Sequence, residues 1–132
     1  VEEAGRGGYV ALREESGTPE LILVATGAEL GVAIEAARAL GKAQKRVRVV
    51  SLPCLEVFGR QDVAYKEAVL PRTARRVSIE AGVTAGWHAL VGDLGLCIGV
   101  DQFGASAPAK VLAEKYGLTA AAIVAKIQAW LG

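Results

Sequence analysis

The chain has 132 residues, of which 52% are hydrophobic and 22% charged, and its 15 basic and 14 acidic residues leave a formal net charge of +1. This length fits one domain of about 100–200 residues, and the composition is that of a globular protein rather than a disordered one. The balanced charge argues against a nucleic-acid-binding domain, which concentrates basic residues on one face. No stretch approaches the roughly 20 apolar residues that a membrane-spanning helix needs.

Apolar runs alternate with segments of helical period, the pattern of βαβ units around a mostly parallel sheet. Residues 9–12 form a weak strand candidate, and residues 21–25 form a strong one that is apolar on both faces, as in a sheet covered by helices on both sides. A helix follows to about Leu40, with Gly41 where helices commonly end. Its apolar stripe comprises Leu30, Ala33, Ile34, Ala37 and Leu40.

The second half of the chain continues the alternation. Residues 47–51 are the next strand candidate, and a helix over about residues 61–69 must stop near Pro71, because a residue before proline avoids helical geometry. Residues 76–80 and 96–100 are the last two strand candidates.

A short helical piece is predicted around Trp87, and two more helices follow later in the chain. Ser106 and Pro108 open one helix, which Gly117 closes. Thr119 is placed to cap a final helix whose apolar face comprises Ala120, Ile123, Val124, Ile127 and Leu131.

Two features of composition bear on the protein's setting. Cys54 and Cys97 have no metal-ligand spacing and are too few for a disulfide framework, so we expect reduced, mostly buried thiols and a cytoplasmic location. The chain begins without a methionine and without the apolar core of a signal peptide, so we expect a segment cut from a longer protein.

Basic residues gather in two short stretches, residues 42–46 and 72–76, each just before a strand candidate. We interpret both stretches as solvated turns in preference to a phosphate-binding patch.

Polar residues follow several predicted strands. In open α/β sheets, ligands bind at the carboxyl ends of the strands, where Thr26, Ser51, Glu80 and Asp101 lie, with Glu29 one helical turn from Thr26. The sequence therefore offers a small-ligand or anion site built on Thr26, Glu29, Glu80 and Asp101. The preferred interpretation is that these side chains cap helices and join loops. No glycine-rich dinucleotide or nucleoside triphosphate loop follows the first strand.

A nucleophilic enzyme would need a base beside its nucleophile. The only histidine is His88, and nothing in the spacing places it beside a cysteine or a serine. We therefore interpret His88 as a surface or interface residue in preference to a catalytic base or a zinc ligand. Trp87 and Phe103 are further candidates for contact with a neighbouring domain.

Seven segments, taken in order and spacing, carry a family resemblance. They are residues 7–10 (GGYV), 23–29 (LVATGAE), 47–53 (VRVVSLP), 58–65 (FGRQDVAY), 78–82 (SIEAG), 86–88 (GWH) and 99–109 (GVDQFGASAPA). Together they resemble the carboxyl-terminal domain of transketolase over almost the whole chain. Ala28 departs from the pattern, since the family more often has serine there, and this puts only a local helix cap in doubt.

The resemblance implies a three-layer α/β/α domain with a five-stranded, mostly parallel mixed sheet whose first strand is antiparallel to the rest. It implies a parent enzyme of the pentose phosphate pathway, a homodimer that uses thiamine diphosphate and a divalent metal such as Mg²⁺ to move two-carbon ketol units between sugar phosphates. In that family the carboxyl-terminal domain packs beside the cofactor-binding domains and contributes to dimer contacts. No catalytic, cofactor-binding or metal-binding residue carries over to this chain.

The residues themselves agree with a non-catalytic role. A thiamine site holds its metal through a Gly-Asp-Gly stretch and a downstream asparagine; residues 92–95 (GDLG) echo only the start of it, and the chain contains no asparagine. We predict one domain over residues 1–132, with residues 1–8 as an inter-domain lead-in, that acts as a structural and dimer-contact domain without bound cofactor. The alternative is a regulatory module that binds a small ligand at the strand ends.

Overall fold

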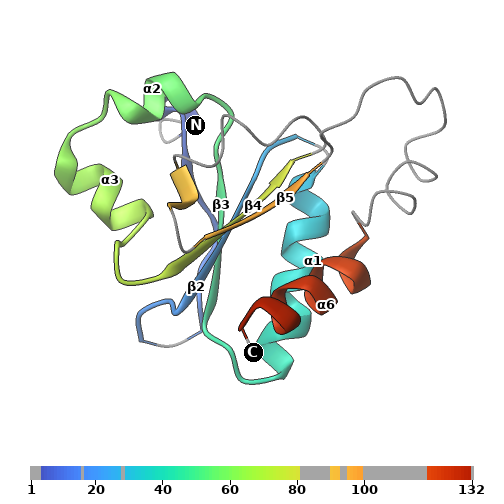
Figure 1. Ribbon diagram of the computed structural model, residues 1–132. Coiled ribbons are helices and arrows are strands. Elements are labelled where there is room, and N and C mark those ends of the chain that lie inside the picture. Colours follow the sequence, from blue (N-terminus) through green and yellow to red (C-terminus); the bar gives the residue numbers. More distant parts are fainter. Residues whose placement is uncertain are drawn as a thin grey trace, which may run out of the picture.

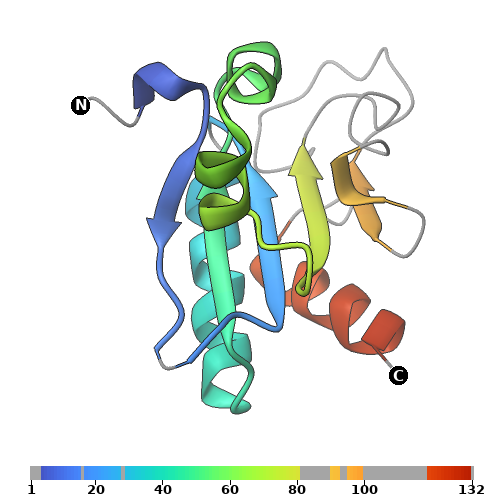
Figure 2. The ribbon, with the colours of Figure 1, turned by 90° about the vertical axis from the view of Figure 1, so that its left-hand side faces the viewer.

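Five strands form one mixed sheet in the computed structural model, which describes residues 4–15, 17–27, 29–80, 90–92, 95–99 and 119–131. The strands are β1 (Tyr9–Leu12), β2 (Leu21–Ala25), β3 (Val47–Ser51), β4 (Arg75–Glu80) and β5 (Leu96–Gly99). Their spatial order is β1-β3-β2-β4-β5. Strand β1 pairs antiparallel with β3 and the other pairs are parallel, which confirms the predicted mixed sheet (Figure 2).

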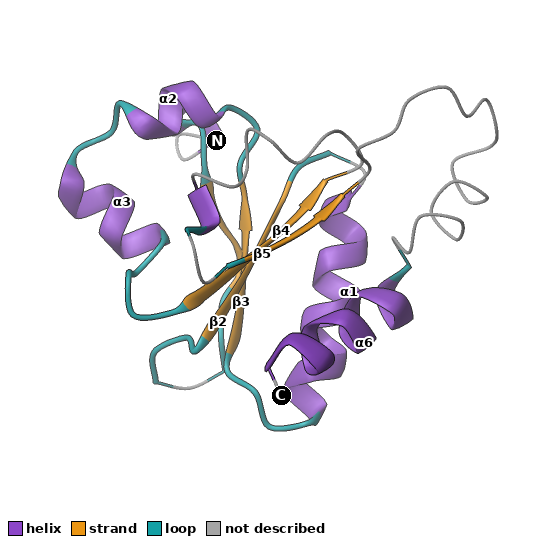
Figure 3. Cartoon of the chain, in the orientation of Figure 1, coloured by secondary structure: helices purple, strands orange, loops and turns teal. Residues whose placement is uncertain are grey.

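Helices cover both faces of the sheet. The described helices are α1 (Glu29–Lys42), α2 (Leu55–Gly59), α3 (Val63–Val69) and α6 (Ala120–Leu131), and a 3₁₀ turn, η1, spans Ala4–Arg6. The helices α1 and α6 lie on one face, and α2 and α3 lie on the other (Figures 1 and 3). The predicted three-layer α/β/α architecture is therefore confirmed. None of the helices in the described ranges is long and apolar enough to cross a membrane.

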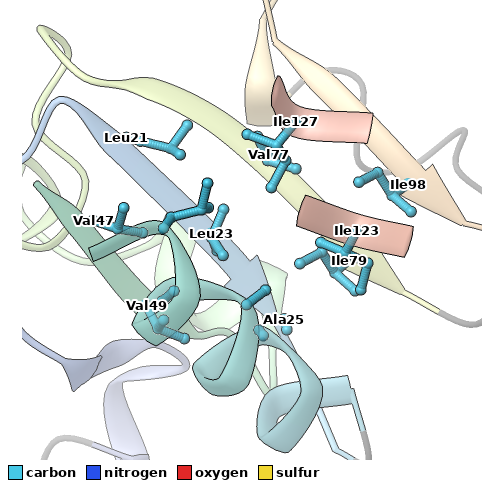
Figure 4. Close-up of a cluster of buried hydrophobic side chains, with 14 residues drawn as sticks. Leu21, Leu23, Ala25, Val47, Val49, Val77, Ile79, Ile98, Ile123 and Ile127 are labelled. Carbon is cyan, nitrogen blue, oxygen red and sulfur yellow. The ribbon is translucent and has the colours of Figure 1, made fainter. Parts of the chain in front are cut away.

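The central strand β2 supplies side chains to both apolar cores, as its unbroken apolar sequence predicts. Leu21, Leu23 and Ala25 belong to the core beneath α1 and α6, shown in Figure 4, where Ile123 and Ile127 of α6 also pack. Ile22 and Val24 point to the other core, beneath α2 and α3. All five residues of β2 are buried, so the strand joins the two outer layers into one domain.

The end of α1 corrects one sequence prediction. The helix continues through Gly41 to Lys42, and the residue in the left-handed conformation is Gln44, with φ 66°. The amide of Lys45 then donates to the carbonyl of Leu40 at 3.1 Å, which closes the helix end. The helix does not end at Gly41, because burial of the apolar side of α1 stabilises the helix by more than one glycine destabilises it.

The remaining helices follow the sequence closely. Helix α3 begins at Val63, where Asp62 accepts a hydrogen bond from the amide of Tyr65 at 2.7 Å. Thr119 Oγ1 accepts from the amide of Ala122 at 3.3 Å, as its predicted capping role requires. The short helix α2 was not expected, because residues 55–59 fill little more than one turn. The predicted helix from Ser106 to Gly117 lies outside the described residues, and so does Val100 of the last strand.

A buried ion pair joins β3 to the segment after β1. Arg48 donates from Nε and Nη2 to the two carboxylate oxygens of Glu14, each at 2.8 Å, and from Nη1 to the carbonyls of Ala68 and Val69 in α3. The two charged side chains are only 6% and 5% exposed. Arg48 therefore fixes one end of α3 against the sheet from a position that the sequence presents as part of an apolar run.

The chain enters the domain through a glycine pair that contacts α2 and α3. The carbonyl of Gly7 accepts from the amide of Cys54 at 3.1 Å, and the carbonyl of Gly8 accepts from the hydroxyl of Tyr65 at 2.8 Å. The guanidinium of Arg6 lies 4.6 Å from the centre of the Tyr65 ring. Residues 4–8 are thus held by the domain, and their service as an inter-domain lead-in stays a prediction.

Candidate functional site

Three of the four residues predicted to form a strand-end cluster lie together. Strands β2 and β4 are parallel neighbours, so Thr26 and Glu80 emerge at the same edge. Thr26 Oγ1 donates to Glu80 Oε2 at 2.6 Å. The amide of Glu29 donates to the carbonyl of Thr26 at 3.2 Å, which brings the first turn of α1 to the same edge. Asp101, the fourth residue, lies outside the described residues.

The charge of this cluster is negative. Burial raises the pKa of Glu29, and the negative charge of Glu80 raises it further. The two carboxylates would repel an anionic ligand, and the hydroxyl of Thr26 is already bonded to one of them. Among the described residues, the polar side chains at this edge therefore bond to one another and carry negative charge, and their role in capping helices and joining loops stays a prediction.

The pH dependence of Glu29 gives a first testable prediction. Because its folded pKa is raised, the folded chain binds a proton that the unfolded chain releases, so this residue costs stability as pH rises above its ordinary value of 4.5. We expect Glu29→Gln to melt at a higher temperature than the parent at pH 7. Below pH 4.5 the two melting curves should converge. Melting temperatures are measured by circular dichroism. If Glu29→Gln and the parent differ by the same amount at pH 7 and below pH 4.5, the raised pKa of Glu29 is contradicted.

None of the candidate interface residues, Trp87, His88 and Phe103, is among those that the structure describes. The expected burial of the thiols is wrong for Cys54, which is exposed; Cys97 is partly buried, and the two form no disulfide with each other. Among the described residues, no three His, Cys, Asp or Glu side chains gather in a way that could hold a metal ion.

An apolar groove that the sequence analysis missed lies between α2, α3 and the approach to β4. We call it the α2–α3 groove; it encloses about 560 Å³ and is lined by Leu55, Phe58, Gly59, Val63, Lys66, Glu67, Leu70, Arg72, Arg76 and Leu90. Val63 is 69% exposed and is the only large hydrophobic side chain so exposed in the described ranges.

Helical spacing is the sequence feature that could have revealed the α2–α3 groove. Val63, Lys66 and Glu67 recur at positions i, i+3 and i+4, so they share one side of α3, and Leu70 follows at i+7 as the residue that caps the end of the helix. Arg76 donates to the carbonyl of Leu90 at 2.8 Å, which fixes the far side of the groove two residues after His88.

The family model and two similar sequences that match this chain are transketolases or transketolase-like domains. The family model described as a transketolase-like C-terminal domain matches residues 7–119. A chloroplastic transketolase of Solanum tuberosum is 50% identical over 95% of this chain, and the chromosomal transketolase of Cupriavidus necator is 50% identical over 93% of it. The chain covers 17% and 18% of these two relatives, so it spans less than a fifth of their length.

Solved structures agree with the sequence matches. Transketolase from Leishmania mexicana superposes on 95% of this chain with a TM-score of 0.84 at 40% identity, and the chain covers 18% of it. Transketolase from Campylobacter jejuni superposes on 96% of this chain with a TM-score of 0.82 at 28% identity, and the chain covers 19% of it.

Proposed function

This chain belongs to the transketolase family as a transketolase carboxyl-terminal domain, and from that premise we propose that it is a non-catalytic structural and subunit-contact domain. The parent would be the thiamine-diphosphate enzyme that transfers two-carbon ketol units between sugar phosphates. Its partners would be the other domains of that enzyme and a second subunit of a homodimer.

The observation that carries this proposal is the α2–α3 groove. Monomeric proteins seldom expose a contiguous apolar hollow unless a partner covers it. Here the exposed Val63 stands beside the buried Phe58 and Leu70, and charged side chains such as Lys66 and Glu67 border the apolar part. An apolar centre with a polar rim is the composition of a protein–protein contact. The fraction of the relatives' length that this chain covers leaves most of a transketolase available to fill the groove.

The strand-end cluster does not suit the diphosphate group of thiamine diphosphate. A diphosphate needs cationic or amide donors, whereas the described side chains here are the carboxylates of Glu29 and Glu80 and the hydroxyl of Thr26. In this proposal, the cofactor and metal are held by parts of the enzyme other than these described residues. The rival proposal of a regulatory anion site at this edge loses support for the same reason.

The cellular location is a separate part of the proposal. A cytoplasmic site stays a prediction, and the relative from Solanum tuberosum is named as chloroplastic.

A hybrid enzyme tests the contact role. The matching domain of the Solanum tuberosum transketolase is exchanged for this chain, and subunit association is measured by sedimentation alongside ketol transfer. We expect an active dimer. Val63→Asp should weaken association by about tenfold or more, because an unpaired carboxylate enclosed in an apolar contact is strongly unfavourable. Ala64→Asp is the matched control, since Ala64 is the next residue of α3, is exposed and does not line the groove.

The isolated chain provides the second half of the test. Calorimetric titration with thiamine diphosphate and Mg²⁺ should give no binding, and the chain alone should transfer no ketol units. Micromolar binding would overturn the non-catalytic assignment. Equal association of the Val63→Asp and Ala64→Asp hybrids would instead remove the α2–α3 groove from the contact.

A further inference from the structure

A second groove lies at the edge of the sheet opposite to the strand-end cluster. It encloses about 530 Å³ between the end of β1, the carboxyl-terminal half of α1 and the start of β3. Its floor is apolar, because Ala37 and Val47 are buried and Leu12 packs against the same core. The groove therefore lies at the amino ends of the parallel strands.

The rim of this groove is basic. Arg13 follows β1, Arg38 and Lys42 project from α1, and Lys45 precedes β3. All four are exposed, and Glu15 is the one carboxylate among the lining residues, so four cations and one anion leave a net charge of +3. We call this hollow, with these five charged residues, the basic groove. It joins Lys42 and Lys45 of the basic stretch at residues 42–46 to Arg38 of α1 and to Arg13 after β1.

The four basic side chains lack hydrogen-bond partners among the described residues. Within these ranges, none of the four side chains donates a hydrogen bond or forms an ion pair, although the charge of Arg13 acts on its neighbour Glu14. Other exposed arginines of this chain do pair: Arg46 with Glu20, and Arg72 with Glu67. The rim of the basic groove thus keeps its hydrogen-bond donors available to a ligand.

Local helix stability explains only part of this arrangement. Lys42 lies in the last turn of α1, where a cation stabilises the helix dipole. Arg38 precedes it by four residues on the same side of the helix, and like charges at that spacing are unfavourable. Arg13 comes from a different element and contributes nothing to α1. A shared anionic ligand would relieve the repulsion among all three.

We propose that the basic groove binds a small organic anion that carries two or more phosphate groups. A phosphate monoester carries a charge of roughly −1.5 to −2 at neutral pH, so two of them match the +3 of the rim. Lysine and arginine are the side chains that bind phosphate through charge-assisted hydrogen bonds. The volume falls in the range of small-molecule sites, about 300–1,000 Å³, and the apolar floor suits a carbon skeleton. This proposal is independent of the contact role, since it uses other residues.

Inorganic triphosphate is a suitable probe. Titrated into the chain at a fixed ionic strength of about 0.15 M, it should bind saturably at one site and raise the melting temperature. Inorganic monophosphate should bind more weakly. The double variant Arg38→Gln with Lys42→Gln should bind triphosphate about tenfold or more weakly, because it loses two charged donors.

The matched control removes the same charge elsewhere. Arg60 and Lys126 are exposed and lie outside the groove, so Arg60→Gln with Lys126→Gln should leave the affinity unchanged. Equal weakening in both double variants would reduce the effect to overall charge and overturn the proposal. Failure to saturate below roughly 1 mM would overturn it as well. A short DNA duplex that binds more tightly than triphosphate, and is released by the groove variant, would replace it with a nucleic-acid surface.

Discussion

Replacing Glu14 with alanine is expected to lower the free energy of unfolding by about 3–5 kcal/mol, because it leaves a buried guanidinium without its counter-charge. Glu14 accepts two hydrogen bonds from Arg48, and both side chains are almost fully buried. Arg48 would keep its bonds to the carbonyls of α3 but lose its carboxylate partner. Urea denaturation followed by circular dichroism gives the midpoint and slope from which this change is obtained.

Glu15→Ala is the matched control, since Glu15 is the next residue and is exposed. It should change the free energy of unfolding by no more than about 0.5 kcal/mol. A double change of Glu14→Leu with Arg48→Met should recover much of the lost stability, because well-packed apolar residues can replace a buried ion pair. If Glu14→Ala is as stable as Glu15→Ala, the Glu14–Arg48 ion pair contributes nothing to the free energy of unfolding.

The same ion pair has a defined pH dependence. The hydrogen bonds from Arg48 lower the pKa of Glu14 below its ordinary value of 4.5. The folded chain therefore releases this proton more readily than the unfolded chain, and the pair stabilises the fold fully above pH 4.5. That stability is lost as the pH falls through the lowered pKa. The difference in the free energy of unfolding between the parent and Glu14→Ala should therefore become smaller as the pH falls below 4.5.

The hydrophobic pattern of the sequence predicts the sheet but does not predict this ion pair. An unbroken apolar run such as residues 21–25 can be buried on both faces only in a covered sheet, so the layer architecture followed from it. Arg48 sits in a similar run, and its charge is acceptable there only because Glu14 reaches it from 34 residues away in the sequence. Such a long-range partner leaves no periodic trace in either segment.

The strand-end cluster could be predicted from strand topology alone, whereas the two grooves could not. Parallel strands place their carboxyl ends at one edge, so the proximity of Thr26 to Glu80 follows once β2 and β4 are neighbours. The basic groove instead requires that the end of an antiparallel edge strand meet the last turns of α1. Residues 42–46 are exposed, as a solvated turn predicts, and their sequence carries no sign that Arg13 and Arg38 lie beside them in the fold.

Gly7→Ala is the second change with a large expected effect. Gly7 has a φ of 84°, which an alanine adopts at a cost of roughly 1–2 kcal/mol. An added Cβ would also lie 2.5 Å from the carbonyl oxygen of Cys54 and closer still to the amide nitrogen of Phe58. Those two groups are hydrogen-bonded to each other at 3.0 Å in the first turn of α2, so neither can move without opening the helix. With overpacking at about 1–3 kcal/mol, the total loss should be about 2–5 kcal/mol.

Two other glycines separate the two causes of this loss. Gly27 has a φ of 56° but open space around its Cβ position, so Gly27→Ala should cost only the backbone part, roughly 1–2 kcal/mol. Gly5 has neither feature, and Gly5→Ala should change stability by about 0.5 kcal/mol or less. Urea midpoints ranked Gly7→Ala below Gly27→Ala below Gly5→Ala would support the close contact of residues 7 and 8 with α2. If Gly7→Ala and Gly27→Ala unfold at the same urea midpoint, the close contact between Gly7 and the first turn of α2 is contradicted.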